Sequence, residues 1–161
     1  MPNFRWRQAS LTVRLLATVF YLSMGTGYVL ALVNAQLKTG GTLAGLASHY
    51  RGAPDGSRYP VEPAELIEVA HAHGFSVPIM YLLLGGLFLG TGVRESWKRR
   101  WVLLPFLGVL IDEAVPWLIR YHAPGWAWVM AGGHAVAGIA FLVLIGVPLR
   151  EMWAPGRQGA A

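Results

Sequence analysis

The apolar residues of this chain fall into four long blocks separated by shorter polar stretches. The blocks cover approximately residues 11–36, 66–92, 101–119 and 125–149. A helix rises 1.5 Å per residue, so blocks of this length span hydrocarbon about 30 Å thick. The pattern predicts an all-α integral membrane protein, a four-helix bundle that forms a single domain over residues 1–161.

Local signals mark where the predicted helices begin and end. Ser10 is a suitable N-cap for the first helix, and Pro63 suits the first turn of the second. Residues 94–100 carry most of the charge between the second and third spans and are expected to form a short basic turn. We expect the polar tail, residues 150–161, to be frayed.

Residues 37–63 form the one long connection, rich in glycine and proline. We expect it to be a loop in which Thr42–Tyr50 makes a short helix on the membrane surface. Loops of this length are usually functional or disordered. His49 is therefore considered either a solvated loop residue or part of a segment that caps a site or docks a partner.

Composition supports the membrane interpretation, because 55% of the 161 residues are hydrophobic and only 13% are charged. Soluble domains carry about 25% charged residues. The net charge is +5, but the basic residues lie at the ends of the apolar blocks, which is a topology signal and argues against a nucleic-acid partner. Nine basic residues fall on the side of the termini and four on the other. This predicts cytoplasmic termini in a bacterial-type inner (plasma) membrane, with the long loop on the outer, periplasmic side.

The chain has no cysteine. Disulfides, thiolate metal sites, iron–sulfur ligation and covalent haem attachment are therefore excluded. A metal or haem must be held by histidine, methionine, carboxylate or backbone groups.

Histidines inside the spans are the main candidates for function, because polar groups are costly in lipid and usually mark sites. His71 lies about 12 Å along the second helix and His134 about 15 Å along the fourth. Two imidazoles at matched depth are the arrangement needed to clamp a haem iron from both faces. His73 points about 200° away from His71, so only one of the two is expected to face such a site, with His73 as the substitute ligand.

Small residues surround His134, including Gly133 and Gly138. They suit either a flat macrocycle or close helix packing. Asp112 and Glu113 lie about 17 Å along the third span. Three roles are considered for them: a salt bridge, with Arg120 as a partner for Glu113; a hydrogen bond that orients a histidine ligand; or a proton acceptor at a quinol pocket.

A metal-ion site is the competing interpretation of the same residues. His71, His73, His122 and His134 with a carboxylate offer ligands for zinc, copper or iron. His49 and His122 are the outlying members of this set. No spacing here is diagnostic of one metal.

The chain resembles the small four-helix b-type cytochrome subunits that anchor respiratory oxidoreductases. The resemblance rests on the four spans, on His71 or His73 in the second span and on His134 in the fourth. The sequence His71-Ala72-His73 also resembles a His-x-His found in membrane proteins related to haem–copper oxidase subunits. The resemblance implies axial ligation of haem b by His71, His73 or His134, and exchange of electrons with quinone.

Our leading hypothesis is a haem b electron-transfer subunit of a membrane complex that passes electrons between quinol and an outer-side redox protein. It is expected to be an electron-transfer or accessory subunit rather than a stand-alone enzyme. The first alternative is a cofactor-free structural or assembly subunit of a larger membrane complex. The second is a membrane protein that binds a metal ion through histidine and carboxylate.

Overall fold

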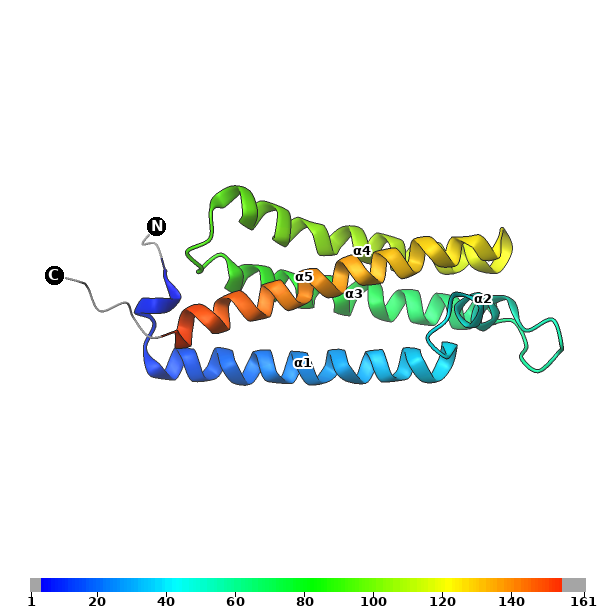
Figure 1. The fold of residues 1–161 in the computed structure, drawn as a ribbon, viewed down its shortest axis with the longest axis horizontal. Helices are drawn as coiled ribbons and strands as arrows, with labels where there is room; N and C mark the ends of the chain where they lie inside the picture. Colours follow the sequence, from blue (N-terminus) through cyan, green and yellow to red (C-terminus); the bar gives the residue numbers. More distant parts are fainter. Residues whose placement is uncertain (1–3, 155–161) are drawn as a thin grey trace.

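The computed structural model describes residues 4–154, which form helices joined by turns and loops, with no strand among them (Figure 1). Its long helices run antiparallel in a bundle, and α1 begins and α5 ends at the same end of the molecule. The elements are η1 (Trp6–Gln8), α1 (Leu11–Thr39), α2 (Leu43–Arg51), α3 (Pro63–Phe88), α4 (Glu95–Tyr121), η2 (Pro124–Trp126) and α5 (Ala127–Trp153). Within the described residues, four helices are long and apolar enough to cross a membrane, which confirms the predicted fold class.

The helices extend beyond several predicted boundaries. The expected basic turn at residues 94–100 is mostly the first two turns of α4, which starts at Glu95. Glutamate, lysine and arginine favour helix, so this stretch continues the apolar span that follows it. The chain instead reverses over residues 89–94. α5 likewise continues to Trp153, into the tail that was expected to fray.

The expected loop at residues 37–63 is partly helical and is tied to the bundle. α1 continues to Thr39 and ends at Gly40, whose positive φ of 62° suits glycine. The expected short helix forms as α2, with the Thr42 side chain accepting a hydrogen bond from the amide of Gly45. Arg51 donates to the carbonyl of Ile119, where α4 ends. The segment therefore closes this end of the bundle.

Trp6 is buried, with only 1% of it exposed. Its Nε1 donates to the carbonyl of Leu87 at 2.8 Å. Arg14 donates to the carbonyls of Arg7, Ala9 and Met152. The N-terminal segment thus seals the end of the bundle opposite α2.

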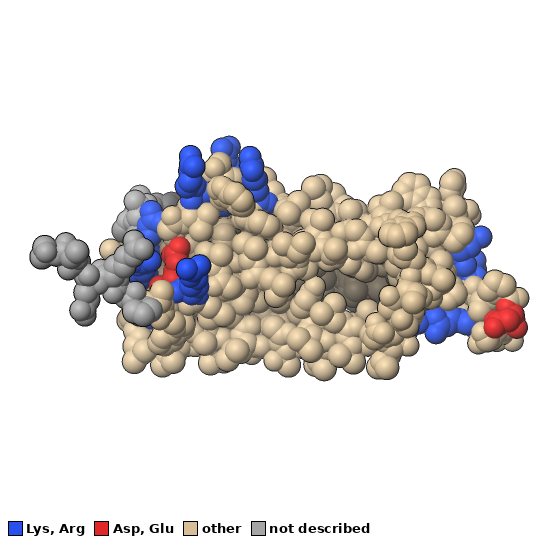
Figure 2. Space-filling view, in the orientation of Figure 1, with Lys and Arg blue, Asp and Glu red and all other residues tan. Residues whose placement is uncertain are grey.

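α1 packs against the bundle through only part of its length. Ala17 and Tyr21 are buried, and the ring of Tyr28 stacks on Phe141 of α5 with centroids 4.4 Å apart. From Val29 to Lys38 every residue is exposed, although this stretch covers almost three helical turns. Figure 2 shows the surface hollowed between α1 and α5, in the half of the molecule nearer α2.

Candidate functional site

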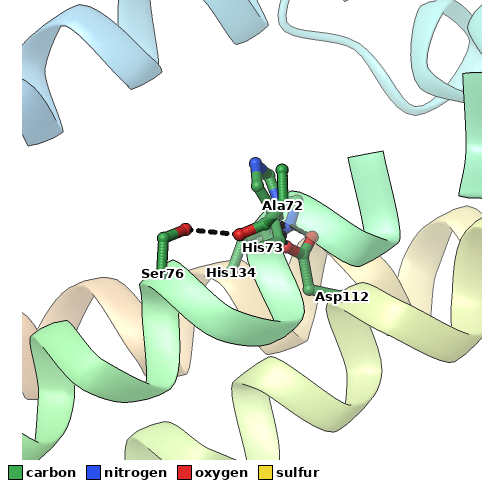
Figure 3. A network of polar contacts seen from close by, with 5 residues as sticks. All are labelled: Ala72, His73, Ser76, Asp112 and His134. Carbon is green, nitrogen blue, oxygen red and sulfur yellow. Dashed lines mark hydrogen bonds and ion pairs between the residues drawn. The ribbon is translucent and has the colours of Figure 1, made fainter. Parts of the chain in front are cut away.

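One carboxylate on α4 binds histidines from the two neighbouring helices. Nδ1 of His73 lies 3.0 Å from Oδ2 of Asp112, and Nε2 of His134 lies 2.8 Å from Oδ1 (Figure 3). An ionised carboxylate only accepts hydrogen bonds, so both imidazoles donate to it. This assignment leaves Nε2 of His73 and Nδ1 of His134 free for other partners.

Close packing of α4 on α5 brings Asp112 within reach of His134. A Cβ on Gly108 would lie 2.8 Å from the Cβ of Ala137, and a Cβ on Gly133 would lie 2.7 Å from Ile111. Real side chains do not approach this closely, so the two glycines let the helices meet at these points. Asp112 lies one turn beyond Gly108 and therefore faces α5.

The two imidazoles are half exposed and the carboxylate is more enclosed. The exposed fractions are 47% for the His73 side chain, 49% for His134 and 24% for Asp112. All three lie on helices long and apolar enough to cross a membrane. In such surroundings the half-exposed imidazole rings meet few groups that can hydrogen-bond. The cluster therefore has unused hydrogen-bonding capacity.

α2 lies near the cluster, at the end of the bundle where α4 finishes. Burial, with the negative charges of Asp112 and Glu65, raises the pKa of Tyr50 to about 12. Tyr50 also packs with Val115 and Ile119 of α4. The short helix thus covers the end of the bundle beyond Asp112.

His71 does not join the cluster. Its ring lies edge-on to Phe75, with centroids 5.2 Å apart, and among the described residues it forms no hydrogen bond. The expected pair of His71 and His134 is therefore not brought together. His73, which was considered the substitute, is the member of the His-x-His that faces α5 through Asp112.

The other histidines lie away from the cluster. Nδ1 of His122 accepts a hydrogen bond from Nε1 of Trp126 at 3.2 Å. His49 packs against Tyr50 on α2, where burial and the nearby Lys38 and Arg58 lower its pKa. Within residues 4–154 no group of three or more histidine, aspartate or glutamate side chains is arranged to hold a metal ion.

The side chain of Glu113 points in a different direction from that of Asp112. Its Oε1 is buried and has no hydrogen-bond partner among the described residues, and its carboxyl group lies opposite Gly74 of α3. The expected salt bridge with Arg120 does not form, because Arg120 donates to the carbonyl of Val61 and lies over the ring of Tyr121. Of the three roles considered for this pair, Asp112 takes the hydrogen bond to histidine.

A haem clamped between two imidazoles does not fit this arrangement. The carboxylate of Asp112 occupies the space between His73 and His134. The room expected over Gly133 is filled by Ile111, and that over Gly138 by the hydroxyl end of Tyr28. These glycines are packing positions here. A haem held on one side by the free Nε2 of His73 fits better, because a carboxylate on the other ring nitrogen is the usual support of a ligating histidine.

The sequence did not identify two residues that shape the packing around the site. Gly108 sets the α4–α5 approach, and Tyr28 fills the space over Gly138. Gly108 precedes Asp112 by one helical turn, and a glycine one turn from an intramembrane carboxylate is a usable signal of close packing there. Tyr28 carries no comparable signal.

Residues 40–159, about three quarters of the chain, match the family Aq_1264_TM, described as a transmembrane helical domain. The chain belongs to this family. No curated protein and no solved structure matches the chain.

Proposed function

We propose that this member of the Aq_1264_TM family is a membrane-embedded subunit of an electron-transfer complex, which binds quinone and quinol at the cluster of His73, Asp112 and His134. The observation that carries the proposal is the carboxylate of Asp112 shared by two half-exposed imidazoles inside the membrane spans. Polar groups at this depth are expensive and are usually retained for function.

The chemistry of the cluster matches a quinone head group. When one nitrogen of each imidazole donates to Asp112, the other nitrogen is an acceptor and can take a hydrogen bond from a quinol hydroxyl. Once that nitrogen has taken up a proton, it can donate to a quinone carbonyl oxygen. When quinol is oxidised it releases two protons and two electrons. His73, His134 and Asp112 are the groups placed to accept the protons, and a redox protein on the outer side is the proposed electron acceptor.

The distribution of charge supports an orientation for this subunit. On the face drawn in Figure 2, lysine and arginine gather at the two ends of the molecule and are absent from the middle. The end that holds the start of α1 and the finish of α5 carries the larger share. We place this end in the cytoplasm of a bacterial-type plasma membrane, with α2 and its flanking loops outside.

The binding test uses the purified protein in lipid nanodiscs. Quinone quenches tryptophan fluorescence, so a titration with ubiquinone or menaquinone reports its binding. We expect Asp112→Asn and His134→Ala to weaken binding about tenfold or more, because each removes a charge-assisted hydrogen bond of the cluster. Glu113→Gln is the matched control, since the Oε1 of Glu113 has no hydrogen-bond partner within residues 4–154. Absence of quenching in the wild-type protein contradicts the proposal.

Haem b is a second candidate cofactor, favoured by one observation. His73 binds Asp112 through Nδ1, which leaves Nε2 free in the manner of a supported metal ligand. A bound haem would supply one-electron transfer. A reduced-minus-oxidised spectrum with a b-type band that His73→Ala removes and His71→Ala keeps would support this candidate. A haem that needs His71 instead would contradict it.

A further inference from the structure

The inner face of α1 changes from buried to exposed along its length. Tyr21, Gly25, Tyr28 and Leu32 recur at helical spacing and so lie on one face. Tyr21 is 1% exposed, and Tyr28 stacks on Phe141, so this face is the one turned toward the bundle. Leu32 on the same face is nevertheless 53% exposed. α1 therefore stands away from the bundle beyond Tyr28.

The opposite side of this gap consists of α3 and α5. Residues 71–76 of α3 and 134–136 of α5 are all exposed. In Figure 3 the side chains of Ala72 and Ser76 stand on the side of α3 that faces α1, and the cluster lies beside them. The small size of these side chains leaves the space open. The gap appears as the hollow between α1 and α5 in Figure 2.

The hollow has apolar walls and one polar place. Within it the half-exposed rings of His73 and His134 offer hydrogen bonds, whereas Leu32 and Gly25 on α1 offer none. Phospholipid tails leave those ring nitrogens without a partner. A ligand with a flat hydrogen-bonding head and a long apolar tail would hydrogen-bond to the imidazoles and pack against the apolar walls.

We propose that the hollow between the outer half of α1 and helices α3 and α5 is the binding site for the isoprenoid tail of a quinone, which enters sideways from the bilayer. This inference rests on the proposed function, because it takes the head group to bind at Asp112 and its histidines. Tyr28 stacked on Phe141 marks the inner end of the hollow, and α2 lies at its outer end.

The test compares a long-tailed quinone with a tail-less benzoquinone of the same head group, by fluorescence titration in nanodiscs. Leu32→Trp fills the hollow from α1. Leu30→Trp is the matched control, since residue 30 lies about 200° away on the same helix and is also exposed. Ala72→Phe fills the hollow from α3 and serves as an independent variant.

We expect Leu32→Trp and Ala72→Phe to weaken binding of the long-tailed quinone about tenfold and to leave the tail-less quinone unchanged. Leu30→Trp should bind both as the wild type does. Equal effects of Leu32→Trp and Leu30→Trp on the long-tailed quinone overturn the hollow as the tail site.

The experiment separates this inference from the proposed function. One outcome is that the wild-type protein binds both quinones equally well and that Asp112→Asn abolishes the binding of both. That result overturns the tail site, because the tail then adds no affinity, but it agrees with a head-group site at Asp112. Wild-type protein that binds neither quinone overturns both.

Discussion

Asp112 of α4 and His134 of α5 are joined by a hydrogen bond of 2.8 Å, and the other oxygen of the same carboxylate binds His73 of α3. One side chain thus connects three of the four candidate membrane spans. Interhelical hydrogen bonds in membranes are worth about 0.6–2 kcal/mol each. The cluster is therefore expected to contribute to stability as well as to function.

Removing the carboxylate tests this contribution. Asp112→Ala leaves both imidazoles without their partner, so the free energy of unfolding should fall by about 1–3 kcal/mol. Unfolding in mixed micelles with increasing SDS measures the change. Glu113→Gln is the control and should not lower the free energy of unfolding, because among the described residues the Oε1 of Glu113 has no hydrogen bond to lose. Equal losses in the two variants contradict a specific role for Asp112.

The imidazole tautomers give a spectroscopic prediction. His73 donates through Nδ1 and His134 through Nε2, so their ¹⁵N signals should report opposite tautomers. Solid-state NMR of histidine-labelled protein in lipid measures them. Asp112→Asn should shift both sets of signals and leave those of His71 in place, because the ring of His71 packs against Phe75 and forms no hydrogen bond to Asp112. A shift of the His71 signals instead would mean that the other histidine of the pair faces Asp112.

The four spans were predictable because lipid requires long uninterrupted apolar helices. The rotation of each helix about its axis was not. His71 and His73 lie in a stretch that is apolar on all sides, so nothing in the sequence shows which of them turns toward α5. That choice depends on contacts such as Gly108 on Ala137, which join distant segments. The sequence predicted that Asp112 lies at a depth similar to that of the histidines. Its hydrogen bonds to His73 and His134 could not be predicted, because they depend on how α3 and α5 pack against α4.

The glycine contacts between α4 and α5 give a packing prediction. A Cβ at position 133 would lie 2.7 Å from Ile111, so Gly133→Ala should lower the free energy of unfolding by about 1–3 kcal/mol. Ile111→Ala removes the Cγ2 atom that the new methyl group would meet, so it should recover part of this loss in the double variant. Gly132→Ala is the matched control, because nothing lies within 4 Å of its added Cβ. It should be neutral or up to about 1 kcal/mol more stable. Similar losses at both glycines contradict this packing.

The last prediction concerns pH and α2, the short helix that closes one end of the bundle. Burial of His49, together with the charges of Lys38 and Arg58, lowers its pKa below the ordinary 6.5. The unfolded chain then takes up a proton on His49 more readily than the folded chain. The stabilisation is complete above pH 6.5 and is lost as the pH falls toward the folded pKa. Between pH 8 and pH 5 the melting temperature of His49→Gln should fall less than that of the wild type. His71→Gln is the control that removes an imidazole elsewhere. A fall in the melting temperature of His49→Gln as large as that of the wild type contradicts the prediction.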